Sequence, residues 1–483
     1  MGMMRRSHAV LGVVLAAFGT WGSLGVTAGV APTVARIVMP VPASSGHILK
    51  TTLSFPPDTT YCRTKIGISC YQPAQFQKAY NLAPLFDKGI TGAGQTIVIV
   101  DAFGSPTIRD DLKHFDATFG LPDPPNLTII QPAGPVPPFP TGSPLGPGNV
   151  SGWAGETTLD VEYSHVMAPG ANILLVETPV TETEGVMGFP EIVAAENYVI
   201  NHHLGSVISQ SFGASEDTFP GKQSILDLRS AFINARKHRV TMLAGSGDQG
   251  STNIKADLTC CFPQRENSWP SVDPLVTSLG GTQLHLDLLG NRMAPDNVWN
   301  DFGASGGGRS KFFDRPQFQE PVKGLTGDHR ATPDISMSAA VDGAAVFYYS
   351  FCDYGRSDPI THIPPLCGPQ WHLVGGTSEA SPLFAGVVAL ANQMGHDPVG
   401  YINNHLYNLG RNGGDNGIVD VTSGDNTWIF CSAACGTPQE VDTTVPGFPA
   451  KKGYDMSSGW GTVNAALFVP ALAGGRDHGG GDK

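Results

Sequence analysis

Four short apolar runs, separated by stretches with a helical period, constrain the fold of this chain most strongly. The runs are residues 95–101, 171–177, 206–211 and 240–245. The first, Gln95–Asp101, is rich in β-branched residues and shows no alternation, as is typical of a strand buried on both faces. Strands of this kind that alternate with helices predict an α/β fold whose central sheet is mostly parallel and flanked by helices on both faces.

The same patterns predict one large domain over residues 73–472. Its helices are expected over 75–86, 156–166, 188–202, 224–237 and 383–391. The stretch 126–150 is rich in proline and glycine and predicts a surface loop. A short segment, 36–72, shows no clear period and precedes the domain, and a disordered tail is expected over 473–483.

The first 35 residues predict a secretory signal peptide. Arg5 and Arg6 precede an apolar stretch over 9–18, and small residues follow. A membrane anchor is the alternative, but the apolar run falls short of the roughly 20 residues that span a bilayer. The chain is therefore expected to be secreted and extracellular, with no stable membrane association.

Charge and cysteine content narrow the classes of partner. The formal net charge is −13 with few basic clusters, which disfavours nucleic-acid binding.

Eight cysteines suit disulfides in an exported chain. Cys62/Cys70, Cys352/Cys367 and Cys431/Cys435 are pairs close in sequence, whereas Cys260 and Cys261 are adjacent and either pair elsewhere or stay partly free. A zinc site is the weaker alternative, because the spacing does not supply four ligands.

A glycine-rich bend before an apolar helix marks a candidate nucleophile. The bend is Gly375–Pro382, and it places Ser378 at the start of the helix. Backbone N–H groups and the positive end of the helix dipole at that point favour an oxyanion. A Ser or Thr that merely caps a core helix is the common alternative.

Carboxylates supply candidates for a base and an acid. Glu156 and Asp160 are four residues apart and share one face of a helix, where a shared proton raises one apparent pKa. Asp248 lies in a glycine-rich loop after a strand, where a neutral carboxyl can donate a hydrogen bond. A solvated acidic helix face and an ordinary Asx turn are the respective alternatives. Asp101, Ser211 and Asp248 all follow predicted strand ends, where sites gather in parallel sheets.

The order and spacing of these signals resemble the sedolisins, the serine-carboxyl peptidases with a subtilisin-like fold. The resemblance extends over roughly residues 73–472. Further matching stretches are residues 207–213, 269–282, 305–310 and 332–336.

The resemblance implies a role for each candidate. Ser378 corresponds to the nucleophile, Glu156 to its base and Asp160 to the acid that orients the base. Asp248 corresponds to the carboxyl that completes the oxyanion hole. These roles imply hydrolysis of peptide bonds in proteins or peptides through an acyl-enzyme at acid pH.

The resemblance also indicates the substrate cleft. Ser211, Phe212 and Gly213 match the strand that pairs with the substrate backbone. Gln249 is expected to influence the first subsite. Asp101 occupies the position where His-based relatives keep their triad aspartate, which suggests a supporting hydrogen bond.

One calcium ion is implied near the C-terminus. Asp420 and Asp455 would supply carboxylates, and Val421, Lys451 and Gly453 would supply main-chain carbonyls. Lys451 stands where the family usually has glycine, so its ammonium must point away from the ion. Two Asx-rich turns are the alternative.

Other readings remain open. A His-based subtilisin-like protease would need a histidine where Glu156 stands, and neither His165 nor His372 is suitably placed. A non-catalytic secreted protein with the same fold is the second alternative, since only about 40 residues separate the leader from the domain, whereas sedolisins usually carry a long folded prosegment. A metal-dependent hydrolase is a third alternative, but this sequence contains no HExxH motif or comparable cluster. A monomer is expected.

Overall fold

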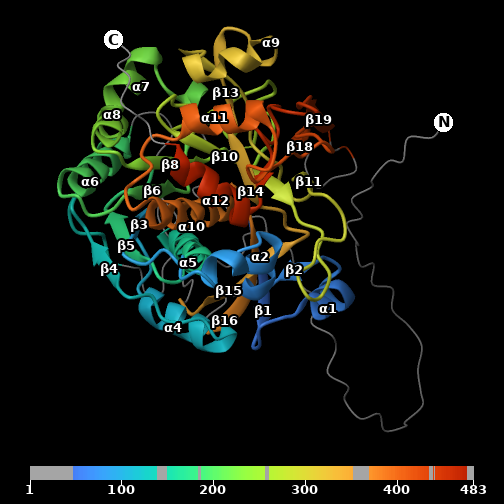
Figure 1. The fold of residues 1–483 in the computed structure, drawn as a ribbon. Coiled ribbons are helices and arrows are strands. Elements are labelled where there is room, and N and C mark those ends of the chain that lie inside the picture. Colours follow the sequence, from blue (N-terminus) through green and yellow to red (C-terminus); the bar gives the residue numbers. More distant parts are fainter. Residues whose placement is uncertain are drawn as a thin grey trace, which may run out of the picture. The chain divides into compact units, whose positions relative to one another are not determined.

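The central sheet has the mostly parallel form that the sequence predicts. The computed structural model describes residues 47–138, 150–182, 187–255, 260–351, 369–433, 439 and 441–475, which belong to one compact unit. Within these residues eight strands form the sheet, and only the pairing of β10 with β11 is antiparallel (Figure 1). In sheet order they are β11 (Asn297–Val298), β10 (Thr277–Gln283), β8 (Thr241–Gly245), β6 (Val207–Gln210), β3 (Thr96–Ala102), β5 (Asn172–Thr178) and β4 (Leu127–Ile130), with β14 (Ile335–Ser338) also paired to β10.

Helices cover both faces of this sheet, because successive residues of its strands point in opposite directions. In β3, Ile97 and Ile99 join a core that includes α5 and α10, whereas Val98 and Val100 join a second core that includes α6, α7 and α8. The prediction of a sheet flanked on both faces is confirmed. These helices are α5 (Val150–Met167), α10 (Thr377–Gly395), α6 (Phe189–Asn201), α7 (Lys222–Leu228) and α8 (Ser230–Lys237).

Several element boundaries differ from the predictions. Residues 127–130 form an edge strand paired with β5, so the prediction of a surface loop throughout 126–150 is wrong there. The predicted helix 75–86 is two helices, α2 (Pro73–Ala79) and α3 (Ala83–Phe86), separated at Asn81, whose φ is 57°. Helix α10 begins at Thr377 rather than at residue 383, and α12 (Ala465–Gly474) extends two residues into the expected tail.

The segment before residue 73 contributes to the fold. Strand β1 (His47–Leu53) pairs antiparallel with β16 (Gln370–Gly375), and β2 (Cys70–Tyr71) pairs with β15 (Ala344–Tyr349), giving a second, four-stranded sheet. A disulfide joins Cys62 to Cys70.

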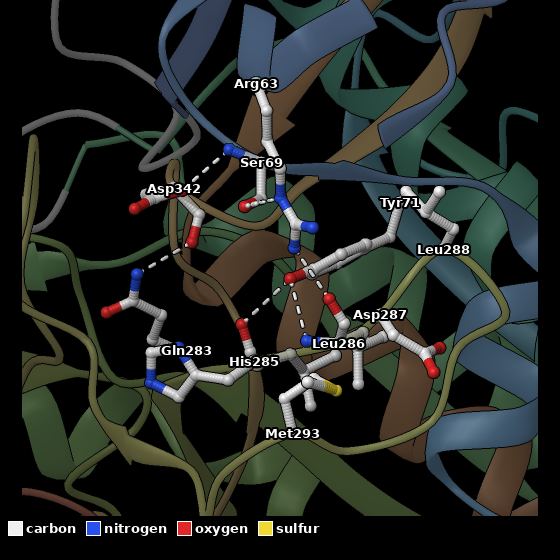
Figure 2. Close-up of a pocket in the computed structure, with 11 residues that line it drawn as sticks. Arg63, Ser69, Tyr71, Gln283, His285, Leu286, Asp287, Leu288, Met293 and Asp342 are labelled. Atoms are coloured by element: carbon white, nitrogen blue, oxygen red, sulfur yellow. Dashed lines mark hydrogen bonds between the residues drawn. The ribbon is translucent and has the colours of Figure 1, made fainter. Parts of the chain in front are cut away.

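Side-chain hydrogen bonds attach this segment to the loop after β10 (Figure 2). The Arg63 Nη2 donates to the carbonyl of Leu286 at 2.6 Å, and the Tyr71 hydroxyl accepts from the Leu286 N–H at 3.0 Å. These contacts border an open cavity of about 210 Å³, which contains none of the predicted site residues.

The remaining elements surround these two sheets. The helices are α1 (Thr59–Tyr61), α4 (Ile108–Phe119), α9 (Lys323–Thr326) and α11 (Asn403–Asn412). Short two-stranded sheets pair β7 (Ala214–Ser215) with β9 (Ser268–Trp269), β12 (Gly308–Asp314) with β13 (His329–Thr332), β17 (Ile418–Val419) with β20 (Thr462–Val463), and β18 (Trp428–Ala433) with β19 (Val441–Val445). A π-helical turn spans Cys62–Ile66, and 3₁₀ turns span Glu216–Thr218 and Gln317–Val322.

Some sequence predictions concern residues that the structure does not describe. The predicted signal peptide lies entirely outside the described residues, as do Cys352, Cys367 and Cys435. Cys260 and Cys261 form a disulfide with each other, so the prediction that they pair elsewhere or stay partly free is wrong. Across the described ranges, every helix is too short or too polar to cross a membrane.

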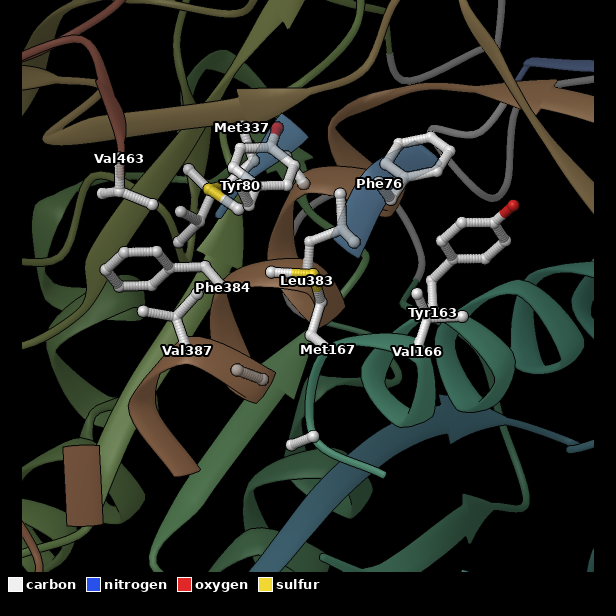
Figure 3. Close-up of a cluster of buried hydrophobic side chains, with 14 of the residues drawn as sticks. Phe76, Tyr80, Tyr163, Val166, Met167, Met337, Leu383, Phe384, Val387 and Val463 are labelled. Atoms are coloured by element: carbon white, nitrogen blue, oxygen red, sulfur yellow. The ribbon is translucent and has the colours of Figure 1, made fainter. Parts of the chain in front are cut away.

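Helices α5 and α10 share one apolar core. Figure 3 shows Tyr163, Val166 and Met167 of α5 beside Leu383 and Phe384 of α10. Gly386 permits the close approach of the two helices, because a Cβ there would collide with the Cβ of Met167. The core therefore fixes the position of two helices that also carry the predicted site residues.

Candidate active site

Helix α5 carries the predicted base and its partner. Glu156 and Asp160 are 1% and 0% exposed. Burial raises the pKa of Glu156 well above its ordinary value, the Ser378 side chain opposes this by hydrogen bonding, and the charges of Asp101 and Asp248 add to it. Burial also raises the pKa of Asp160, as do Asp101 and Glu156. The group therefore retains protons under conditions in which exposed carboxyls are ionised.

The first turn of α10 carries the predicted nucleophile. Strand β16 ends at Gly375, Gly376 turns the chain with φ 144°, and the helix begins at Thr377. A Cβ at Gly375 would lie 2.6 Å from the carbonyl oxygen of Ala339, so the turn requires glycine. Ser378 is buried in this turn, where backbone N–H groups lack intrahelical acceptors. The structure thus brings Ser378 and Glu156 together from two helices.

Asp248 lies against the same turn. It follows β8 by three residues, and its Oδ1 accepts hydrogen bonds from the N–H and the hydroxyl of Thr377, both at 2.8 Å. A Cβ at Gly245 would lie 3.0 Å from the Thr377 Oγ1, which shows how closely the two segments approach. Burial raises the pKa of Asp248 to about 7, and the two bonds from Thr377 oppose this. Asp248 is therefore neutral in acid.

Asp101 is a further carboxyl of this group. It is fully buried near the end of β3, and its register partner on β5 is Glu177. Burial raises its pKa to about 7, Thr157 opposes this by hydrogen bonding, and the charge of Glu177 adds to it. Asp101 and Asp160 act on each other electrostatically, so the structure extends the Glu156–Asp160 pair by a third acid.

The predicted substrate strand borders the nucleophile. The Ser211 hydroxyl donates to the carbonyl of Ser378 at 3.4 Å, and a Cβ at Gly213 would lie 2.5 Å from the Ser268 Oγ. The Phe212 side chain is 3% exposed and packs near the Trp153 ring, with centroids 6.4 Å apart. Phe212 could therefore offer a substrate its backbone rather than its ring.

Gln249 continues the chain directly after Asp248. Its backbone forms an isolated parallel bridge with Ala304, and the residue is 9% exposed. The adjacent Gly250 N–H donates to the Ala304 carbonyl at 3.0 Å, which fixes the loop on that side of Asp248.

The predicted calcium residues lie on two loops that approach each other. The Gly453 N–H donates to the Asp420 Oδ2 at 2.8 Å, and the Lys451 N–H donates to the Asp455 Oδ2 at 2.9 Å. Burial raises the pKa of Asp420, and the charge of Asp455 adds to this. Val421 is buried and Lys451 is exposed. The Asp455 Oδ1 accepts hydrogen bonds from the N–H and hydroxyl groups of both Ser457 and Ser458, and the charge of Lys452 lowers the pKa of Asp420. The other carboxylate and carbonyl oxygens of the two loops are of the type that calcium prefers, so calcium binding here remains a prediction.

His165 is not placed to serve Ser378 as a base. Its Nε2 lies 2.7 Å from the carbonyl oxygen of Pro122 and 3.5 Å from the Asp116 Oδ1. Burial lowers the pKa of His165 to about 4. The His165 ring therefore points towards α4 and Pro122. His372 lies on β16 against the rings of Phe347 and Tyr349.

Two site residues had no assigned role in the sequence analysis. Thr377 donates the two hydrogen bonds that hold Asp248, and the sequence indicated it only by its position next to Ser378. Glu177 lies beside Asp101 through the register of β3 and β5. The sequence could have indicated this contact, because Asp101 and Glu177 each end the apolar run of a predicted strand.

The chain resembles several characterised peptidases in sequence. It is 30% identical over 413 residues to kumamolisin of Bacillus sp. (strain MN-32), covering 84% of this chain and 64% of that protein. It is 29% identical over 331 residues to human tripeptidyl-peptidase 1, covering 66% and 51%, and 24% identical over 403 residues to sedolisin of Pseudomonas sp. (strain 101), covering 82% and 60%. The chain thus spans about half to two thirds of the length of these relatives. No family model matches it.

A solved structure has the same fold. The structure of Pseudomonas sedolisin, described as a serine-carboxyl proteinase complexed with two molecules of pseudo-iodotyrostatin, aligns with a TM-score of 0.62 and 24% identity. The alignment covers 84% of this chain and 98% of the other.

Fold and site together define a subtilisin-like α/β protein in which buried carboxyls surround a serine at a helix N-terminus. The sequence relatives specify it further. The chain belongs to the sedolisin family, the serine-carboxyl peptidases.

Proposed function

We propose that this chain is an acid-acting serine-carboxyl endopeptidase. The observation that supports this most directly is the grouping of Ser378 with Glu156, Asp160 and Asp248, all buried and drawn from two helices and a strand end. Glu156, oriented by Asp160, takes the proton from Ser378 as its oxygen attacks the peptide carbonyl. The protonated Asp248 and the backbone at the helix N-terminus stabilise the oxyanion.

The second half of the cycle reverses the proton transfers. Glu156 returns the proton to the leaving amine, which leaves an ester between the acyl group and Ser378. Water then attacks this ester and gives its proton to Glu156, and the Ser378 oxygen recovers a proton as it leaves. No proton is gained or lost over the whole cycle.

Acid action follows from the ionisation of Asp248. Its pKa is raised to about 7, so it keeps the proton it must donate below that pH and loses it above. The Glu156–Asp160–Asp101 group cannot ionise fully because its charges repel, so it holds a proton while still offering a carboxylate. Activity is therefore expected to fall as the pH rises through about 7.

The same proposal includes secretion, protein or peptide substrates and a monomeric state. Secretion is supported by the charged and apolar segments of residues 1–35. A protein that works in acid outside the cell is consistent with a formal net charge of −13.

We also propose that one calcium ion stabilises the C-terminal loops. Asp420 and Asp455 would hold it with the carbonyls of Val421, Lys451 and Gly453. The ion would neutralise the repulsion between the two carboxylates. It takes no part in the reaction.

Protein digestion across a pH series tests the proposed activity. Casein or haemoglobin would be incubated from about pH 2.5 to about pH 8 with the wild type, Ser378→Ala and Glu156→Ala. Cleavage confined to acid and lost in both variants is expected. A folded wild type that cleaves nothing at any pH would favour the non-catalytic alternative, and an optimum above neutrality would contradict the role of Asp248.

A further inference from the structure

The carboxyl of Asp248 is held from one side only. Its Oδ1 accepts two hydrogen bonds, from the N–H and from the hydroxyl of Thr377, each at 2.8 Å. Its Oδ2 is buried and has no hydrogen-bond partner among the described residues. An oxygen that faces two donors is a poor place for a proton, because a third hydrogen would be directed at the other two. The proton of the neutral acid therefore belongs on Oδ2.

The direction of the Thr377 hydroxyl is itself fixed. Its oxygen accepts the N–H of Gly247 at 3.1 Å, so its hydrogen remains available for Asp248. Gly247 has φ 107°, a conformation that favours glycine. The backbone thus presets the hydroxyl to donate, and it does so before any substrate is present.

From these contacts we infer that Thr377 is a positioning residue: it holds Oδ1 of Asp248 so that the proton on Oδ2 is directed at the oxyanion. The inference rests on the proposed function, since it assigns a task within that reaction. Thr377 makes no contact with the reacting atoms in this role, and no bond is made or broken. It decides which of two chemically equal oxygens is the donor.

The arrangement has a consequence for pH dependence. Hydrogen bonds from Thr377 favour the charged form of Asp248 and so lower its pKa, which burial has raised. Removal of the Thr377 hydroxyl would remove one of these hydrogen bonds, and the pKa of Asp248 would rise further. The charge of Asp248 also raises the pKa of Glu156 on α5, so the titration of Glu156 has to be measured separately with Glu156→Gln.

The first test compares Thr377→Val with Thr377→Ser. The valine variant keeps the shape and the backbone N–H but loses the hydroxyl, and the serine variant keeps the hydroxyl. Thr377→Val is expected to lose about tenfold or more in kcat with little change in KM, and its alkaline limb is expected to move to higher pH. Thr377→Ser should restore both. A valine variant with the wild-type pH profile, or a serine variant as impaired as valine, would overturn the inference.

A second variant covers the case in which Thr377→Val does not fold. In Asp248→Asn, the two Thr377 donors should bind the amide oxygen and turn the amide NH₂ towards the oxyanion. This variant should keep part of the activity that Asp248→Ala loses, and its alkaline limb should disappear, because an amide does not ionise. Activity no higher than that of Asp248→Ala would overturn the inference.

Ser378→Ala in the same assay separates the two proposals. If Ser378→Ala remains active, the proposed function is wrong. If it is inactive while Thr377→Val behaves as wild type, only the positioning role is wrong. Melting curves at acid pH show that each variant is folded.

Discussion

Glu196 offers a test of how far burial governs the pH response of this protein. It lies on α6, is 0% exposed, and neither carboxyl oxygen has a hydrogen-bond partner among the described residues. Burial is the cause that raises its pKa from 4.5 to about 8. A carboxyl with a raised pKa stabilises the folded state fully below its unfolded pKa, and this stability is lost as the pH rises through the folded pKa.

Replacement of Glu196 by glutamine removes this titration while keeping the shape of the protonated acid. At pH 7 the Glu196 carboxyl is ionised in the unfolded state and neutral in the folded state. Folding of the wild type must therefore bind a proton at a pH about 2.5 units above the unfolded pKa of 4.5. At 1.36 kcal/mol per unit, the glutamine variant should be more stable than wild type by about 3 kcal/mol at neutral pH. At pH 4 both side chains are neutral in both states, and the difference should be small.

Urea unfolding at about pH 4 and about pH 7 measures this difference, because only the change between the two proteins reports on Glu196. Glu191→Gln, on the same helix but partly exposed, is the matched control and should leave stability nearly unchanged. If Glu196→Gln and wild type show the same pH dependence, Glu196 is not held neutral in the folded state, and burial cannot be the cause invoked.

Three further predictions follow from other parts of the structure. Asp455→Asn should abolish the calcium-dependent rise in melting temperature, whereas wild type should melt at lower temperature after EGTA at mildly acid pH; an unchanged wild-type midpoint would contradict the calcium proposal. Gly386→Ala should destabilise the protein by about 1–3 kcal/mol and lower kcat, because the added Cβ collides with Met167 between α5 and α10. Gly324→Ala, where the space is open, is the control. A Gly386→Ala variant that melts at the same temperature as Gly324→Ala would contradict the close contact. Casein cleavage by wild type should fall as the pH rises through about 7, and a profile that stays flat to about pH 9 would show that Asp248 is not the donor.

The sequence predicted the parallel core well, because β3, β5 and β8 each contain an uninterrupted apolar run, residues 97–100, 173–176 and 242–244, with no alternation of polar residues. It also placed Glu156 and Asp160 on one helix face, Asp248 after a strand and Ser378 at a helix start. It did not predict β4, since three apolar residues and a threonine within a Pro- and Gly-rich stretch carry too little pattern. It showed no period before residue 73, because β1 and β2 are held by pairing with strands more than 270 residues away.

The electrostatics of the site were harder to predict. Glu156 and Asp160 on one helix face are compatible with a solvated helix, and only the burial of α5 on all described sides distinguishes the two cases. The contact of Thr377 with Asp248 depends on the path of the loop after β8 and of the turn into α10, and sequence spacing carries no information about such a contact. The roles of Asp420 and Asp455 remain predictions that a calcium measurement will decide.

The close contact of α5 with α10 at Gly386 separates two properties that an enzyme must evolve. The hydrophobic core shared by α5 and α10 holds the two helices that carry Glu156 and Ser378. Insertions or substitutions in surface loops that do not contact this core would leave the position of the two helices unchanged. In a lineage of such proteins, substrate preference can therefore diverge quickly while the catalytic geometry is inherited intact with the core.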